Sequence, residues 1–180
     1  DQRDLMEVEA TGLATVTPGK SLSAVYHAFA AAYNHADRLD AITWFTAVGE
    51  PAYDTLLGFL EDDRTSVVGS ALAALGATRD HRLVPYLREA GRPEWTGALG
   101  LEYARTRVRL GDWEAMPVLI EGLESEVKLE RALCVETLYE ATRERHGFVA
   151  GASLPERRAA VERWRGWWER RSADALLAGS

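Results

Sequence analysis

The sequence offers few side chains in arrangements that support catalysis or metal binding. Its single cysteine, Cys134, excludes an intramolecular disulfide and a thiolate metal cluster. The four histidines, at positions 27, 35, 81 and 146, lack the spacing of zinc ligands such as H-E-x-x-H. Neither a glycine-rich phosphate loop nor a Ser, His and Asp set with a recognisable local signature is present. We therefore expect a protein without catalytic residues, cofactor or metal.

Two further groups of reactive side chains have structural interpretations. Cys134 shares an apolar helix face with Leu138, which predicts a buried small hydrophobic residue and not a reactive thiol. The acidic residues Glu61, Asp62 and Asp63 precede a helix that is expected to start near residue 66, so capping of that helix accounts for them. A metal ion would require more oxygen ligands than this cluster provides.

A partly basic, aromatic segment is the candidate binding site. The chain between residues 81 and 95 departs from the pattern of its neighbours, because Arg88 and Gly91 stand where apolar residues are expected. Arg105 and Arg109 share one face of the next helix, and arginine and tryptophan are favoured anchors of protein interfaces. The candidate partner-binding residues are His81, Tyr86, Arg88, Arg92, Trp95, Arg105 and Arg109. The alternative interpretation is a local irregularity in which the arginines are solvated and Trp95 packs between helices.

Apolar residues recur along the chain with a period of about thirty-one residues. Four segments follow, fully or in part, the spacing i, i+3, i+4 and i+7, which is typical of one face of an amphipathic helix. These segments begin at Leu22, Tyr53, Val84 and Met116, so they are 31, 31 and 32 residues apart. A fixed period of this length is the signature of a helical repeat.

Further helices are predicted between these segments. The predicted helices and the glycines that close them are 34–48 with Gly49, 66–75 with Gly76, and 94–110 with Gly111. Pro51 suits the first turn of the next helix, and Asp80 and Asp112 are predicted to cap exposed amide groups. A short extended piece is predicted at residues 13–17, and strand signals are otherwise absent. The predicted fold class is all-α.

Two of the units share a longer motif. The first reads ALAALG at residues 71–76, then Asp80, then LVPYL at residues 83–87, and the second reads LGD at residues 110–112, then AMPVLI at residues 115–120. Both are similar to bacterial HEAT repeats of the phycobilin-lyase type, a resemblance that covers about residues 36–145 well and 21–35 loosely. It implies a right-handed α-solenoid of about four to five antiparallel helix pairs, stabilised by stacking and closed by caps.

The two ends differ from the repeats. We expect residues 1–20 to be an N-terminal lead-in or linker, residues 21–152 to form the helical repeats, and residues 153–180 to form a C-terminal capping helix. The candidate cap residues are Ser153 and Glu156, which have capping-box spacing, and Trp164, Trp167 and Trp168, which fall on one helix face. A basic helix with tryptophans can also lie on a membrane surface or dock a partner, and both alternatives stay open.

The formal net charge of −7 argues against a general nucleic-acid binder, because phosphate neutralisation supplies most of such affinity. The leading hypothesis is a non-catalytic protein-binding scaffold or accessory subunit of a larger bacterial assembly, with a basic or neutral protein partner. The alternatives are a peripheral membrane or assembly subunit that uses the C-terminal helix and, implied by the resemblance, a HEAT-like lyase or DNA glycosylase.

No apolar run approaches the roughly 20 residues of a membrane span. Cytoplasm is the default expectation, and an exported or processed form stays open because the chain begins at Asp1.

Overall fold

The structure is a computed structural model that describes the backbone of residues 35–178 and the side chains of residues 42–174. The predicted lead-in, the extended piece at residues 13–17 and the apolar segment that begins at Leu22 lie outside the described residues. Over the described range the regular elements are all helices, which confirms the all-α prediction there. The chain divides into two compact units, the first ending at Ala90 and the second beginning at Gly91, and each is described by itself.

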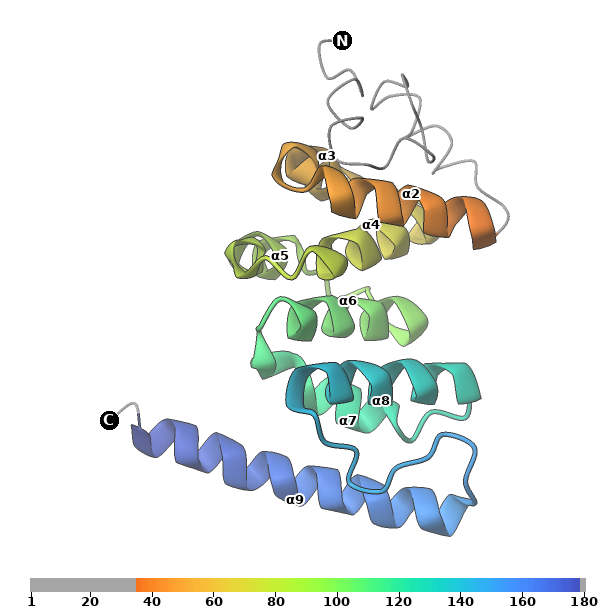
Figure 1. Cartoon of the computed structure of the whole chain (residues 1–180), viewed down its shortest axis with the longest axis vertical. Helices are drawn as coiled ribbons and strands as arrows, with labels where there is room; N and C mark the ends of the chain where they lie inside the picture. Colours follow the sequence, from red (N-terminus) through yellow and green to blue (C-terminus); the bar gives the residue numbers. More distant parts are fainter. Residues whose placement is uncertain (1–34, 179–180) are drawn as a thin grey trace. The chain divides into compact units, whose positions relative to one another are not determined.

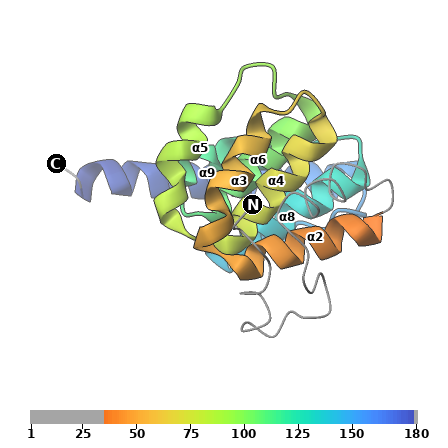
Figure 2. The same cartoon turned by 90° about the horizontal axis from the view of Figure 1, so that it is seen from above.

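Unit 1 is built from α-helices and short 3₁₀ turns. Its elements are α2 (His35–Val48), η2 (Glu50–Ala52), α3 (Tyr53–Gly58), η3 (Phe59–Glu61), α4 (Thr65–Thr78), η4 (His81–Leu83) and α5 (Val84–Ala90), where η marks a single 3₁₀ turn. Both α2, orange in Figures 1 and 2, and α3 pack against α4. Trp44, Phe45, Leu56 and Leu72 are fully buried between them. Their removal from water is the main stabilising term of this unit.

Unit 2 has the same kind of packing and ends in a long helix. Its elements are α6 (Gly97–Arg109), η5 (Trp113–Ala115), α7 (Met116–Gly122), α8 (Lys128–Thr142) and α9 (Leu154–Ala178). Each of α6 and α7 packs against the other and against α8, and α9, blue in Figure 1, packs against α7. One apolar cluster joins all four helices through residues such as Ala104, Leu119, Leu138 and Trp164.

The same order of elements recurs at the interval that the apolar pattern predicted. The 3₁₀ turns η2, η4 and η5 begin at residues 50, 81 and 113, which are 31 and 32 residues apart, and each leads directly into an α-helix. A proline lies early in each of these segments, at Pro51 within η2, at Pro85 in the first turn of α5 and at Pro117 in the first turn of α7. Proline is tolerated there because the first amide groups of a helix have no carbonyl partner within the helix. Local sequence thus sets where α3, α5 and α7 start.

Helix ends are only partly as predicted. Gly49 and Gly111 have φ angles of 68° and 93°, the left-handed backbone that favours glycine. The prediction that Gly76 closes its helix is wrong, because α4 continues to Thr78 and Arg79 takes the left-handed position with φ 55°. Gly76 is instead buried within α4. The helix predicted from residue 94 begins later, at Gly97.

The predicted acidic caps have different roles. Asp80 accepts a hydrogen bond from the Arg82 amide, as a capping residue should. Asp112, which precedes η5, makes no such bond, and its buried carboxylate instead accepts from Arg107. Asp62 accepts from the amide and the guanidinium of Arg64 two residues later, which forms a turn ahead of α4 and does not cap that helix. The neighbouring cation decides in each case where the carboxylate points.

No helix between residues 35 and 178 combines the length and the apolarity that a membrane span requires.

Candidate functional site

A groove on unit 2 is the best candidate for a binding site. It has a volume of about 470 Å³, and the residues that line it lie in the loop before α6, along α6, and from the end of η5 to the end of α7. The lining residues are Arg92, Pro93, Trp95, Thr96, Gly97, Gly100, Leu101, Tyr103, Ala104, Arg107, Ala115, Val118, Glu121 and Gly122. We call it the α6–α7 groove. Its volume falls within the range of about 300–1,000 Å³ that is usual for sites of small ligands and short segments.

Two aromatic rings form a wall of the α6–α7 groove. The Trp95 and Tyr103 rings meet edge to face, with centroids 5.2 Å apart, and both side chains are half-buried. Glycines permit this approach. A Cβ atom at Gly91 would overlap the Tyr103 hydroxyl, and one at Gly100 would lie 2.7 Å from the Trp95 carbonyl oxygen. The wall is therefore held by close contacts that larger residues at these two positions would disturb.

The rest of the lining is mostly apolar. Ala104, Ala115 and Gly122 are buried, and Leu101 packs partly buried against the core of unit 2. Val118 is 43% exposed, which makes it one of the large apolar side chains that remain open to solvent. A second molecule that covered Val118 would remove apolar area from water and would be stabilised by that burial.

Three charged side chains line the same groove. The Arg107 Nε donates to Oδ2 of Asp112 at 2.7 Å, and its guanidinium carbon lies 5.5 Å from the Tyr103 ring centroid. Arg92 also interacts within the chain. Glu121 is exposed and has no ion-pair partner in the part of the chain with described side chains. The lining therefore holds one carboxylate whose charge is not compensated by a neighbour.

Two of the predicted partner-binding residues belong to the lining of the α6–α7 groove. Arg92 and Trp95 both line the α6–α7 groove. His81, Tyr86 and Arg88 are exposed residues of η4 and α5 in unit 1, and they are not part of that lining.

Arg105 and Arg109, which were also predicted to bind a partner, both contact α8 within unit 2, and their partner-binding role stays a prediction. Arg105 is only 7% exposed, donates to the Thr137 hydroxyl at 3.0 Å and forms an ion pair with Glu102, and burial lowers the pKa of its guanidinium. Arg109 donates to Glu140 at 3.0 Å. Both arginines join α6 to α8, because the helix face that they share is the one that packs against α8.

Most of the groove lining was not predicted from the sequence, including the aromatic, charged and exposed apolar side chains Tyr103, Arg107, Val118 and Glu121. These four side chains give the groove most of its character. A local signal exists for three of them. Tyr103 and Arg107 are four residues apart and so share a helix face, and Val118 lies off the apolar stripe of its helix and so faces outward. That Glu121 lines the same groove as the aromatic wall depends on how α7 packs against α6.

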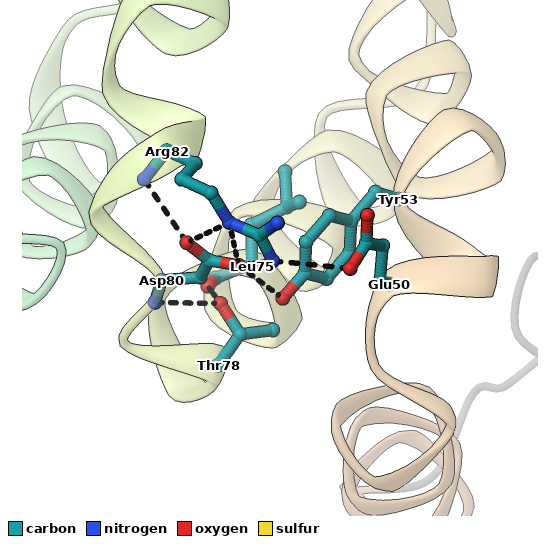
Figure 3. A network of polar contacts seen from close by, with 6 residues as sticks. All are labelled: Glu50, Tyr53, Leu75, Thr78, Asp80 and Arg82. Carbon is teal, nitrogen blue, oxygen red and sulfur yellow. Dashed lines mark hydrogen bonds and ion pairs between the residues drawn. The ribbon is translucent and has the colours of Figure 1, made fainter.

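A second polar cluster, on unit 1, has the residue types of an acid–base site (Figure 3). The Tyr53 hydroxyl donates to Asp80 at 3.0 Å, and the Arg82 guanidinium donates to Asp80 at 2.6 Å and to Glu50 at 3.1 Å. Hydrogen bonds from Arg82 hold the pKa of Asp80 below its usual value, and burial raises the pKa of Tyr53. Neither group therefore exchanges a proton near neutral pH. The hydrogen bonds of this cluster connect the start of α3 and the turn before it to the turn before α5.

The C-terminal helix packs against unit 2 with its tryptophan face. Glu156 accepts hydrogen bonds from the amide and the hydroxyl of Ser153 at 3.0 and 2.6 Å, which is the reach-back contact of a capping box. These bonds lower the pKa of Glu156. Trp164 is fully buried in the core, and Trp167 and Trp168 pack half-buried against it. The side chains that would enter a membrane surface are thus largely occupied by protein contacts.

Other reactive groups are poorly placed for chemistry. Cys134 is buried, and burial raises the pKa of its thiol to about 12, so it is protonated at neutral pH and is a weak nucleophile. In the portion of the chain that the structure describes, no group of three or more His, Cys, Asp or Glu side chains is arranged to hold a metal ion.

Comparison with known proteins gives no relative. No protein family, no curated protein and no solved structure matches this chain significantly.

Proposed function

We propose that the protein is a non-catalytic protein-binding module, a scaffold or accessory subunit, that holds an extended segment of a partner protein in the α6–α7 groove. In this proposal the recurring helix pairs are HEAT-like, stack as a right-handed solenoid and are closed by α9. The partner adds no folding cost to the module, because the groove is already formed by α6, α7 and the loop before α6.

The observation that carries the proposal is the composition of the α6–α7 groove. It combines an exposed apolar side chain, Val118, with a half-buried Trp95 and two arginines within one volume of about 470 Å³. Tryptophan and arginine are enriched among the residues that dominate protein interfaces, and they act in pockets that exclude water. A concave, mostly apolar site with a few polar groups at fixed positions is the usual form of a binding site.

The packing of α9 favours this proposal over a membrane-surface role for the C-terminal helix. A helix that lies in a membrane interface inserts its apolar face into the lipid. The fully buried Trp164 would have to leave the core of unit 2 for that purpose, at a cost of about 3–5 kcal/mol by analogy with deletion of a buried tryptophan.

The test is a selection of random dodecapeptides, displayed on phage, against the full chain. Selected peptides are then measured against Val118→Glu, which places a charge in the groove, and against Val149→Glu, which alters an exposed valine outside the groove lining. Val118 and Val149 are 43% and 62% exposed, so both variants should fold, as circular dichroism would show. We expect peptides that bind the wild type and Val149→Glu and lose at least tenfold in affinity for Val118→Glu. Equal binding to all three proteins would refute the proposal.

Accessibility of the groove can be measured without a partner. Cys134 is the single cysteine of the sequence and is buried, so it should react slowly with a maleimide. A cysteine in place of Val118 should react nearly as fast as one in place of Val149. Protection of the Val118→Cys thiol in the free protein would mean that the groove is already covered, and the proposal would then fail.

A further inference from the structure

We infer that the α6–α7 groove selects a segment in which a large apolar side chain is followed closely by a lysine or arginine. This inference deepens the proposed function and rests on it. It concerns which partner sequence the groove accepts, and it follows from the charges and rings of the lining.

The preference for a large apolar side chain follows from the apolar residues that line the groove together with Val118. The side chains of Leu101, Ala104 and Val118 and the ring of Trp95 offer no hydrogen-bonding atom to the groove other than the indole N–H. A polar side chain placed among them would lose its water without gaining a partner, which is costly. A leucine, methionine or phenylalanine would instead bury apolar area. An apolar anchor is therefore the occupant that these surfaces stabilise.

The preference for a lysine or arginine follows from which of the three charged side chains in the lining already have a partner within the chain. Arg107 is held by Asp112, whose side chain is 1% exposed, so its positive charge is already neutralised from inside the unit. Arg92 is engaged within the chain. Glu121 is exposed, and no cation pairs with it among the described side chains. A partner cation can therefore gain a charge-assisted contact at Glu121, whereas a partner carboxylate at Arg107 would compete with Asp112, which already neutralises that guanidinium.

The aromatic wall agrees with this selection. The Tyr103 ring already carries one guanidinium, that of Arg107, at 5.5 Å from its centroid. The negative face of an aromatic ring attracts cations and disfavours anions, and tryptophan is the strongest such face. Trp95 lines the same groove as Glu121. A lysine or arginine beside the anchor would meet a carboxylate and an aromatic ring, and the formal charge of −7 would assist its approach over longer distances.

The test uses fluorescein-labelled octapeptides that contain one phenylalanine followed, one to three positions later, by lysine, glutamine or glutamate. Affinities for the full chain are measured by fluorescence polarisation at low salt. We expect the best lysine peptide to bind about two- to fivefold more tightly than its glutamine counterpart, the range of a partly exposed ion pair. The glutamate peptide should bind more weakly than both.

A double-mutant cycle assigns the preference to one residue. Glu121→Gln should remove the advantage of lysine over glutamine, whereas Glu126→Gln, a change at an exposed acid of the α7–α8 loop outside the groove lining, should leave it intact. An unchanged lysine preference in Glu121→Gln, or a preference for glutamate in the wild type, would overturn the inference while Val118-dependent binding could still stand. Loss of Val118 dependence itself would instead overturn the proposed function.

Discussion

Gly122 and Gly58 provide a matched pair of substitutions with opposite expected effects. Both are the last residues of short α-helices, α7 and α3, and a helical glycine costs roughly 0.5–1 kcal/mol relative to alanine. A Cβ atom at Gly58 would meet nothing within 4 Å, whereas one at Gly122 would lie 2.6 Å from Sγ of Cys134 and 2.8 Å from Cδ2 of Leu101. Replacement of glycine by alanine should therefore improve helix propensity equally at both positions, whereas only the new methyl group at position 122 would strike its neighbours.

The magnitude follows from these distances. Carbon atoms pack best at about 3.5–4.0 Å, so Cys134 and Leu101 must each retreat by about 1 Å to admit Gly122→Ala. Overpacking of this kind costs about 1–3 kcal/mol, and we take the upper half of that range because two neighbours are displaced. After the gain in helix propensity, Gly122→Ala should lower the free energy of unfolding by about 1–2 kcal/mol. Gly58→Ala should raise it by up to about 1 kcal/mol.

Urea unfolding followed by tryptophan fluorescence is the appropriate measurement. Trp44 lies in unit 1, and the other five tryptophans of the sequence lie in unit 2, so the signal reports mainly on the unit that contains Gly122. In thermal unfolding, Gly122→Ala should lower the Tm by about 2–8 °C for a chain of this length. Far-ultraviolet circular dichroism, which reports on all helices, provides the corresponding measurement for Gly58→Ala.

A second substitution tests the cause. Cys134→Ala removes the sulfur atom that the new methyl group would strike and leaves the Cβ of residue 134 at 3.7 Å from it, an ordinary contact. The double variant Gly122→Ala/Cys134→Ala should therefore lose less than the sum of the single losses, with a coupling of about 1 kcal/mol. Strict additivity, or a Gly122→Ala protein as stable as the wild type with an unchanged urea dependence, would refute the assigned contact.

Three further outcomes are expected in unit 2. Trp164→Ala should destabilise the protein by about 3–5 kcal/mol and Trp168→Ala by clearly less, since Trp164 is fully buried and Trp168 is half-buried; equal urea midpoints for the two variants would contradict this. Arg131 is 7% exposed and donates to the carbonyl oxygens of Ser125, Glu126 and Ala150, so Arg131→Met should cost about 2–4 kcal/mol by urea unfolding, and a loss below about 1 kcal/mol would show that water replaces these bonds. The pKa of His146 is lowered from 6.5, chiefly by burial and also by Arg163 and Arg170, against the opposing effect of Glu144. At low pH the unfolded chain therefore binds a proton at His146 that the folded chain does not bind. The free energy of unfolding should be at its full value above pH 6.5 and should fall as the pH drops below it. His146→Gln should reduce this loss of stability between pH 7.5 and 5.5. An identical pH dependence in the wild type and His146→Gln would exclude this role.

The sequence predicts the helices well and the partners of polar groups poorly. Apolar spacing and early prolines fix where helices start, because these depend on contacts within a few residues, and the Ser153–Glu156 contact follows from the same local rule. Asp80 and Asp112 occupy similar positions before η4 and η5, yet only Asp80 caps its turn. The difference arises from Arg107, which reaches Asp112 from the preceding helix.

The residues of the candidate groove likewise fall into those that the sequence identified and those that only the structure revealed. The sequence by itself identified Arg92 and Trp95, because the irregular stretch before α6 breaks the apolar pattern and is visible in the residues alone. Only the tertiary structure showed that Arg105 is buried against α8 and that Val118 and Glu121 line the same groove as the aromatic wall. Periodicity reveals which residues share a helix face, but which face is covered, and by what, is decided by packing between helices that are distant in sequence.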